Sequence, residues 1–195
     1  AYQSRGLGDV YKRQVFMKED EQDYRIWKNK NFVVESTITL SLWDEILING
    51  FHEKLNKILN EIFKQIGFVY SNSKISISIS FSGDKKIMEL NSCFRKKISA
   101  TNVLSFTSNS NFNNTLFLGD IIFSIETILK EAKRDNKTVE NHLIHLFIHA
   151  VLHLLGYEHE TEEQAKKMEN LEIKILSNLQ IAVSYTHLTL PTISV

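Results

Sequence analysis

The chain has 195 residues and a mass of 22.6 kDa, a size typical of one domain. Hydrophobic residues make up 43% of it and charged residues 24%, which excludes a disordered or collagen-like chain. Acidic and basic residues both number 23, so any nucleic-acid binding must depend on local patches. The single cysteine, Cys93, excludes an internal disulfide framework, and no apolar run approaches the roughly 20 residues that span a bilayer. We therefore expect a cytoplasmic domain.

Both ends of the chain resemble translated sequencing adapter. The letters DVYKRQ, at positions 9–14, are one translation of GATGTGTATAAGAGACAG, the end used in transposon-based sequencing libraries. VSYTHL, at positions 183–188, translates the reverse complement of that adapter. We predict non-native tails at 1–14 and 183–195 around a native domain at 15–182. Source DNA that encodes both tails when sequenced without that library chemistry would contradict this, in favour of native tails.

Between the tails, hydrophobic periodicity predicts alternating strands and helices. In chain order the expected elements are a strand over 31–40, a helix over 43–66, a strand over 73–81, a helix over 84–94, strands over 101–107 and 116–124, and helices over 125–134, 138–155 and 162–179. A basic loop at 95–100 and a polar turn at 108–114 lie between them. This order predicts a single α+β domain, with a mixed sheet of about four strands and about five helices on one face.

Three histidines in the segment HAVLHLLGYEH predict a metal site. His149 and His153 are four residues apart on the expected helix, so both side chains project from the same face. Gly156 is a candidate C′ residue in left-handed geometry, which lets His159 fold back as a third ligand. Three neutral imidazoles with an open fourth position suit a catalytic Zn²⁺, one per chain, as on the histidine helix of zinc hydrolases.

Two further histidines lie on the same helical stripe. His145 and His149 are also four residues apart and form an alternative pair, but only His149 and His153 are followed by the glycine and the third histidine. We interpret His142 and His145 as supporting or ordinary polar residues. The HxxxHxxGxxH skeleton is shared with metzincin proteases, whose glutamate base is replaced here by Ala150.

The histidine segment resembles the HGxLHLxGYDH signature of the YbeY family of zinc-dependent endoribonucleases, which act as ribosomal RNA maturation factors. Upstream, LNSCFRKKISATNVLSF resembles that family's LNxxFR…TDVLSF segment, LGDIIFS its LGDI strand, and EEQAKKMENLEIKIL its terminal helix. The resemblance covers about residues 31–180. Three positions depart from the family pattern: Ala150 replaces glycine, while Glu158 and Asn102 replace aspartate. Asn102 thereby loses a charge.

The resemblance implies a single-strand-specific, zinc-dependent endoribonuclease that matures the 3′ end of 16S rRNA and serves ribosome quality control. It implies that His149, His153 and His159 are catalytic metal ligands and that Arg95 is catalytic at the phosphate. The implied partner is ribosomal RNA of the small subunit, with no membrane and no DNA. Arginine also suits this role on chemical grounds, because its guanidinium is a permanently charged, bidentate phosphate ligand.

Two other functions stay open at this stage. A metallopeptidase-like zinc hydrolase shares the histidine skeleton. Because Ala150 stands where metzincins have their glutamate base, such an enzyme would need another way to activate water. A non-catalytic ribosome assembly factor with a structural zinc would need a fourth protein ligand, for which Cys93 is the only cysteine.

The carboxylates near the histidines also have two interpretations. Asp120 is either an acceptor that orients a ligand histidine or a turn residue. Glu158 and Glu160 are either general-base candidates or solvated carboxylates beside a turn.

Overall fold

The computed structural model describes residues 23–46, 50–68, 73–96 and 98–181. For Glu45 and Arg95 it describes the backbone but not the side chain. Both tails predicted to derive from adapter lie outside these residues. The elements are β1 (Asp23–Lys28), β2 (Phe32–Ile38), α2 (Leu42–Ile46), α3 (His52–Gln65), β3 (Lys74–Ser82), α4 (Asp84–Arg95), β4 (Val103–Phe112), β5 (Thr115–Ser124), α5 (Ile125–Arg134), α6 (Val139–Leu154) and α7 (Glu162–Asn178). Within this described part of the chain, no helix has the length and apolar character that crossing a membrane requires.

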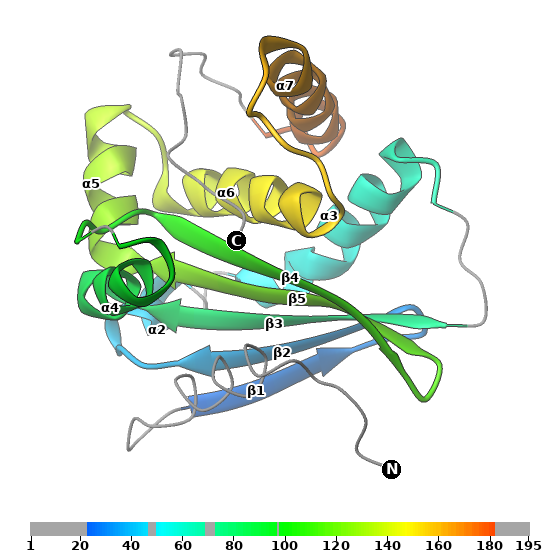
Figure 1. Ribbon diagram of the computed structural model, residues 1–195, viewed down its shortest axis with the longest axis horizontal. Coiled ribbons are helices and arrows are strands. Elements are labelled where there is room, and N and C mark those ends of the chain that lie inside the picture. Colours follow the sequence, from blue (N-terminus) through cyan, green and yellow to red (C-terminus); the bar gives the residue numbers. More distant parts are fainter. Residues whose placement is uncertain (1–22, 47–49, 69–72, 97, 182–195) are drawn as a thin grey trace.

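The strands form one mixed sheet in the order β1-β2-β3-β5-β4 (Figure 1). The central pairs, β2 with β3 and β3 with β5, are parallel, whereas β1 and β4 run antiparallel to their neighbours. The single α+β domain with a mixed sheet is therefore confirmed. The described part has five strands, one more than expected, and six helices.

The additional strand, β1, has no buried apolar face, which explains why the sequence pattern missed it. Its burial alternates between exposed and half-buried, and Tyr24 and Ile26 are both more than half exposed. Backbone pairing with β2, from Asp23 opposite Ile38 to Lys28 opposite Val33, defines the strand instead. The polar turn predicted over 108–114 is confirmed only at 113–114, because β4 continues to Phe112 through exposed and half-buried residues paired with β5.

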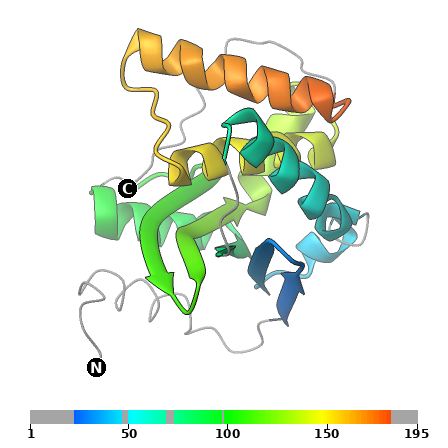
Figure 2. The same ribbon diagram turned by 90° about the vertical axis from the view of Figure 1, so that its right-hand side faces the viewer.

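The sheet is covered on both faces, so the expectation of helices on one face is wrong. Helices α3 and α6 pack on one face over the main hydrophobic core, with α7 as an outer layer against both (Figures 1 and 2). On the opposite face, α4 packs a smaller core made of Ile87, Leu90, Leu104, Phe106 and Ile122. Strand alternation sends Ile121 and Ile122 of β5 to these two different cores.

The helix predicted over 43–66 is divided into α2 and α3. Gly50, just before α3, has a φ of +95°, far from the regular right-handed α-helical value. The amphipathic spacing that predicted one helix persists in α3, whose buried face includes Leu55, Leu59 and Ile62.

Gly119 of β5 lies close to the backbone of β4 and to a side chain of α6. Its φ is +149°, and a Cβ there would lie 2.0 Å from the carbonyl oxygen of Phe106 and 3.0 Å from Cδ2 of Leu154. We expect Gly119→Ala to lower the free energy of unfolding by more than about 2 kcal/mol, because backbone atoms cannot yield to the methyl group. Urea denaturation measures this loss.

Gly67→Ala provides the matched control. Gly67 also has a positive φ, +69°, but a Cβ there meets no atom within 4 Å. Only the backbone strain of about 1–2 kcal/mol then applies. Equal losses in the two variants would show that crowding at Gly119 contributes nothing.

Candidate metal centre

The end of α6 turns the chain back over the helix, as the sequence predicts. Gly156 has a φ of +87°, and its N–H donates to the carbonyl of His153 at 2.9 Å. The N–H of Tyr157 donates to the carbonyl of Leu152 at 3.0 Å. This pair of bonds is a Schellman motif, which satisfies carbonyls at the end of the helix. The reversal carries His159 toward the side chains of the last two turns.

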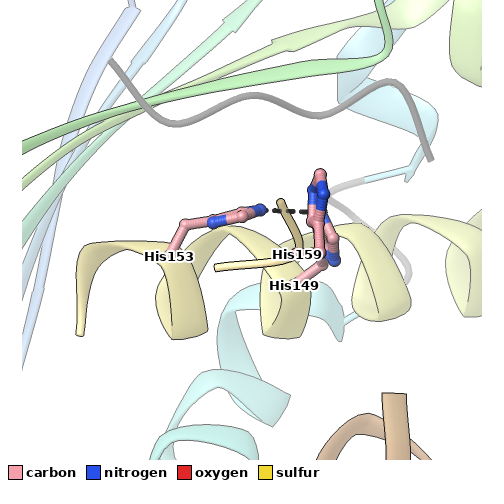
Figure 3. Close-up of side chains that lie close together, drawn as sticks. All are labelled: His149, His153 and His159. Carbon is pink, nitrogen blue, oxygen red and sulfur yellow. Dashed lines mark hydrogen bonds between the residues drawn. The ribbon is translucent and has the colours of Figure 1, made fainter. Parts of the chain in front are cut away.

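The structure brings together the three histidines that the sequence selects (Figure 3). One ligand nitrogen from each of His149, His153 and His159 lies within 4.8 Å of the others. The Nε2 atoms of His149 and His153 are 3.1 Å apart, and both residues are buried, whereas His159 is half-buried on the loop after α6. His159 is therefore the most exposed member of the group.

Burial keeps His153 in the form that a metal requires. Removal from water, together with the neighbouring imidazoles of His149 and His159, lowers the pKa of His153 to about 3. At neutral pH the ring is therefore uncharged and keeps a nitrogen lone pair for coordination.

The geometry of the group fits a tetrahedral ion. Two nitrogens at the usual Zn–N distance of about 2.0–2.1 Å lie about 3.3 Å apart on such an ion, close to the observed separation of the two Nε2 atoms, 3.1 Å. Among the described residues, the group has three members, and Cys93 is exposed on α4 and is not among them. Three protein ligands leave one position for water or substrate, as in catalytic sites.

A buried carboxylate that the sequence analysis missed supports the group. Glu172 of α7 lies with Oε1 2.5 Å from Nδ1 of His149 and Oε2 3.1 Å from Nε2 of His145. Burial alone raises the pKa of the Glu172 carboxyl, but the hydrogen bonds from the two imidazoles lower it to about 2. One signal was available: Glu172 follows Met168 by four residues and precedes Ile175 by three, so an acidic residue lies on the apolar face of the helix.

The other two histidines of α6 do not belong to this group of three, and each contacts a carboxylate instead. His145 contacts Glu172, whereas Nε2 of His142 lies 2.7 Å from Oε2 of Glu131 on α5. Asn102 joins the second pair by donating from Nδ2 to the same oxygen of Glu131, at 2.9 Å. Both His142 and Asn102 are fully buried, so this is a second polar cluster on α6.

The remaining candidates lie in different places. Asp120 is within β5 opposite Phe106, on the sheet face covered by α4, so the carboxylate at His149 is Glu172 instead. Oε2 of Glu158 is 3.6 Å from Nδ1 of His153, and Glu160 is exposed. Arg95 is the last residue of α4, and its side chain lies outside the described part of the structure.

Comparison with known proteins gives consistent matches over most of the chain. A family model described as Endoribonuclease YbeY matches residues 40–180. A protein named Endoribonuclease YbeY from Bartonella quintana is 43% identical over 161 residues, covering 80% of this chain and 98% of the relative. Another of that name, from Thermodesulfovibrio yellowstonii, is 42% identical over 139 residues, covering 64% and 87%. The solution structure of TM1509 from Thermotoga maritima has a TM-score of 0.46 and 24% identity, covering 75% of this chain and 91% of that chain.

We expect His153→Ala to abolish stoichiometric metal binding. Two imidazoles rarely hold an ion against a chelator, so zinc should fall from about one per chain to far below that after gel filtration. Elemental analysis of the purified protein measures the content. His142→Ala is the control, since it removes a buried imidazole of the same helix outside the ligand group. Full zinc content in His153→Ala would mean that the ligand set is wrong and that His145 is the first residue to test.

Proposed function

Because the chain belongs to the YbeY endoribonuclease family, we propose that it is a zinc-dependent endoribonuclease specific for single-stranded RNA. Its proposed role is maturation of ribosomal RNA at the 3′ end of the 16S molecule, together with ribosome quality control. The proposed partner is the small ribosomal subunit, and the proposed place of action is the cytoplasm. Neither a membrane nor DNA has a part in this function.

The observation that carries the proposal is the group of three histidines, two of them buried, which lies within the part of the chain that the family model matches. Three nitrogen donors favour zinc over magnesium or calcium, which prefer oxygen ligands. A set of three protein ligands is typical of catalytic zinc sites, whereas structural sites are closed by a fourth. This argues against the assembly factor with a structural zinc.

Phosphodiester cleavage builds negative charge on the phosphate, and this chain offers two sources of positive charge for it. His149, His153 and His159 would hold the ion, which when bound polarises the phosphoryl group and lowers the pKa of water. Arg95 would bind the phosphate through its guanidinium, which donates two parallel hydrogen bonds. Glu158 faces the second ring nitrogen of His153 and would help to hold that ring in place.

A peptidase is the second candidate, because the histidine skeleton is shared with metzincins. Those proteases activate water with a glutamate that follows the first histidine. Here that position is Ala150, which is fully buried in the core. The described structure offers no carboxylate at this position, which favours the nuclease.

Incubation with single-stranded RNA, duplex RNA and casein, each with and without a chelator, tests the proposed function. We expect cleavage of single-stranded RNA only, loss of activity with the chelator, and recovery when zinc is returned, because His149, His153 and His159 would hold the ion on which the proposed activity depends. Cleavage of casein alone would favour the peptidase. A zinc-loaded protein that cuts neither substrate would favour the assembly factor.

Arg95→Ala separates metal binding from catalysis. We expect full zinc content and normal folding but slower RNA cleavage, by about 2–4 kcal/mol of lost transition-state stabilisation. Arg95→Lys should recover part of the rate, because an ammonium keeps the charge but loses the planar fork. Cleavage rates and zinc content are measured on the same preparations.

Lys85→Ala is the matched control for Arg95→Ala, since it removes an exposed positive charge from the same helix. Equal rates in the two variants would reduce Arg95 to a surface charge. A parallel loss of zinc and activity in Arg95→Ala would assign that residue to the support of the metal site.

A further inference from the structure

Glu172 connects the last helix of the chain to the metal centre. It lies on the buried face of α7, and each of its two oxygens meets a different imidazole of α6. Oε1 is 2.5 Å from Nδ1 of His149, and Oε2 is 3.1 Å from Nε2 of His145. Only 7% of Glu172 is exposed, so water does not compete for these contacts.

The contact with Glu172 determines which nitrogen of His149 carries the proton. A carboxylate only accepts hydrogen bonds, so the Nδ1 atom that faces it must be the donor. In the neutral ring, Nε2 then has a free lone pair. That atom points toward His153, at an Nε2–Nε2 distance of 3.1 Å. The lone pair on Nε2 of His149 is thus on the side of the ring that faces His153.

We infer that Glu172 is a positioning residue of the metal centre, which holds His149 in the tautomer and orientation that coordinate the ion. This inference rests on the metal site proposed above. A carboxylate behind a metal-binding imidazole fixes the ring and raises its basicity, and loss of such a partner lowers metal affinity about 10–100-fold.

His145 completes the arrangement from the other side of the carboxylate. It lies one helical turn before His149 on α6, so both rings reach the same acidic group. With one oxygen held by each ring, the carboxylate cannot rotate away from His149 without losing a buried hydrogen bond. His145 therefore acts on the site through Glu172, and not as a ligand.

The contact also couples the metal centre to the packing of α7. A capping box, in which the Thr161 side chain and the Gln164 side chain bond each other's backbone N–H groups, begins the helix directly after the loop that carries His159. Met168 and Ile175 bury the face on which Glu172 lies. Helix α7 therefore helps to place both His159, on the loop before it, and Glu172, which contacts His149.

Zinc titration of the full chain against a competing chelator tests this role. Glu172→Met removes both acceptor oxygens at similar length, and we expect affinity about 100-fold below that of the unaltered chain. Glu172→Gln keeps one acceptor oxygen and should lose only about 10-fold. Circular dichroism checks folding, and if the methionine variant does not fold, the glutamine variant carries the test.

Glu131→Gln is the matched control. Glu131 also accepts from a buried histidine of α6, at 2.7 Å, but that residue, His142, is outside the ligand group. We expect its zinc affinity to stay within about two-fold of the unaltered chain, even if the protein is less stable. Equal affinity losses in Glu131→Gln and Glu172→Gln would attribute both to general destabilisation and overturn the inference.

A second readout does not depend on metal. Imidazole ¹⁵N shifts of the metal-free protein report the tautomer of His149, and we expect Nδ1–H in the unaltered chain and a mixture in Glu172→Met. Zinc affinity that is unchanged in Glu172→Met, or an Nε2–H tautomer in the unaltered chain, would overturn the positioning role alone. Failure of the unaltered chain to bind zinc would instead overturn the proposed metal site itself.

Discussion

Helix α6 is buried along almost its whole length, so the polar side chains that it carries need partners inside the protein. Two carboxylates from neighbouring helices meet this need. Glu131 of α5 contacts His142, and Glu172 of α7 contacts His149. Each contact ties a different helix to α6 at a defined point, because an unpaired imidazole or carboxylate in the core costs more than the bond itself contributes. The polar contacts thus fix how the helices around the site are arranged.

The same burial prepares the candidate metal centre. In the core, charge on closely spaced imidazoles is unfavourable, which holds the pKa of His153 well below its usual range and leaves its ring neutral. The Schellman turn at Gly156 then supplies a third imidazole from outside the helix. The three imidazoles lie close enough together to be candidate ligands of one ion, and two of them are already held in the core.

The second polar cluster gives a physical reason for a departure from the family pattern. Asn102 stands where the resembling family has aspartate, and its amide donates to Glu131. An aspartate there would place two carboxylates side by side in a buried position, with mutual repulsion. Burial alone raises the pKa of Glu131, but hydrogen bonds from His142 and Asn102 lower it, so the carboxylate keeps its charge. The asparagine is therefore compatible with Glu131 at this position, since it replaces a repulsive contact by a hydrogen bond.

The sequence by itself determined the features that depend on neighbours along the chain. Hydrophobic periodicity predicted the spans of α5, α6 and α7, and the three histidines follow from helical spacing and one glycine. The tertiary structure alone decided the features that depend on distant partners. Strand β1 and the end of β4 are held by backbone pairing with exposed side chains, which leaves no hydrophobic pattern. Likewise, Glu172 becomes the partner of His149, 23 residues away, only because α7 packs on α6. Local spacing encodes the candidate ligands, whereas the carboxylate that contacts His149 is selected by the packing of whole helices, which no short segment contains.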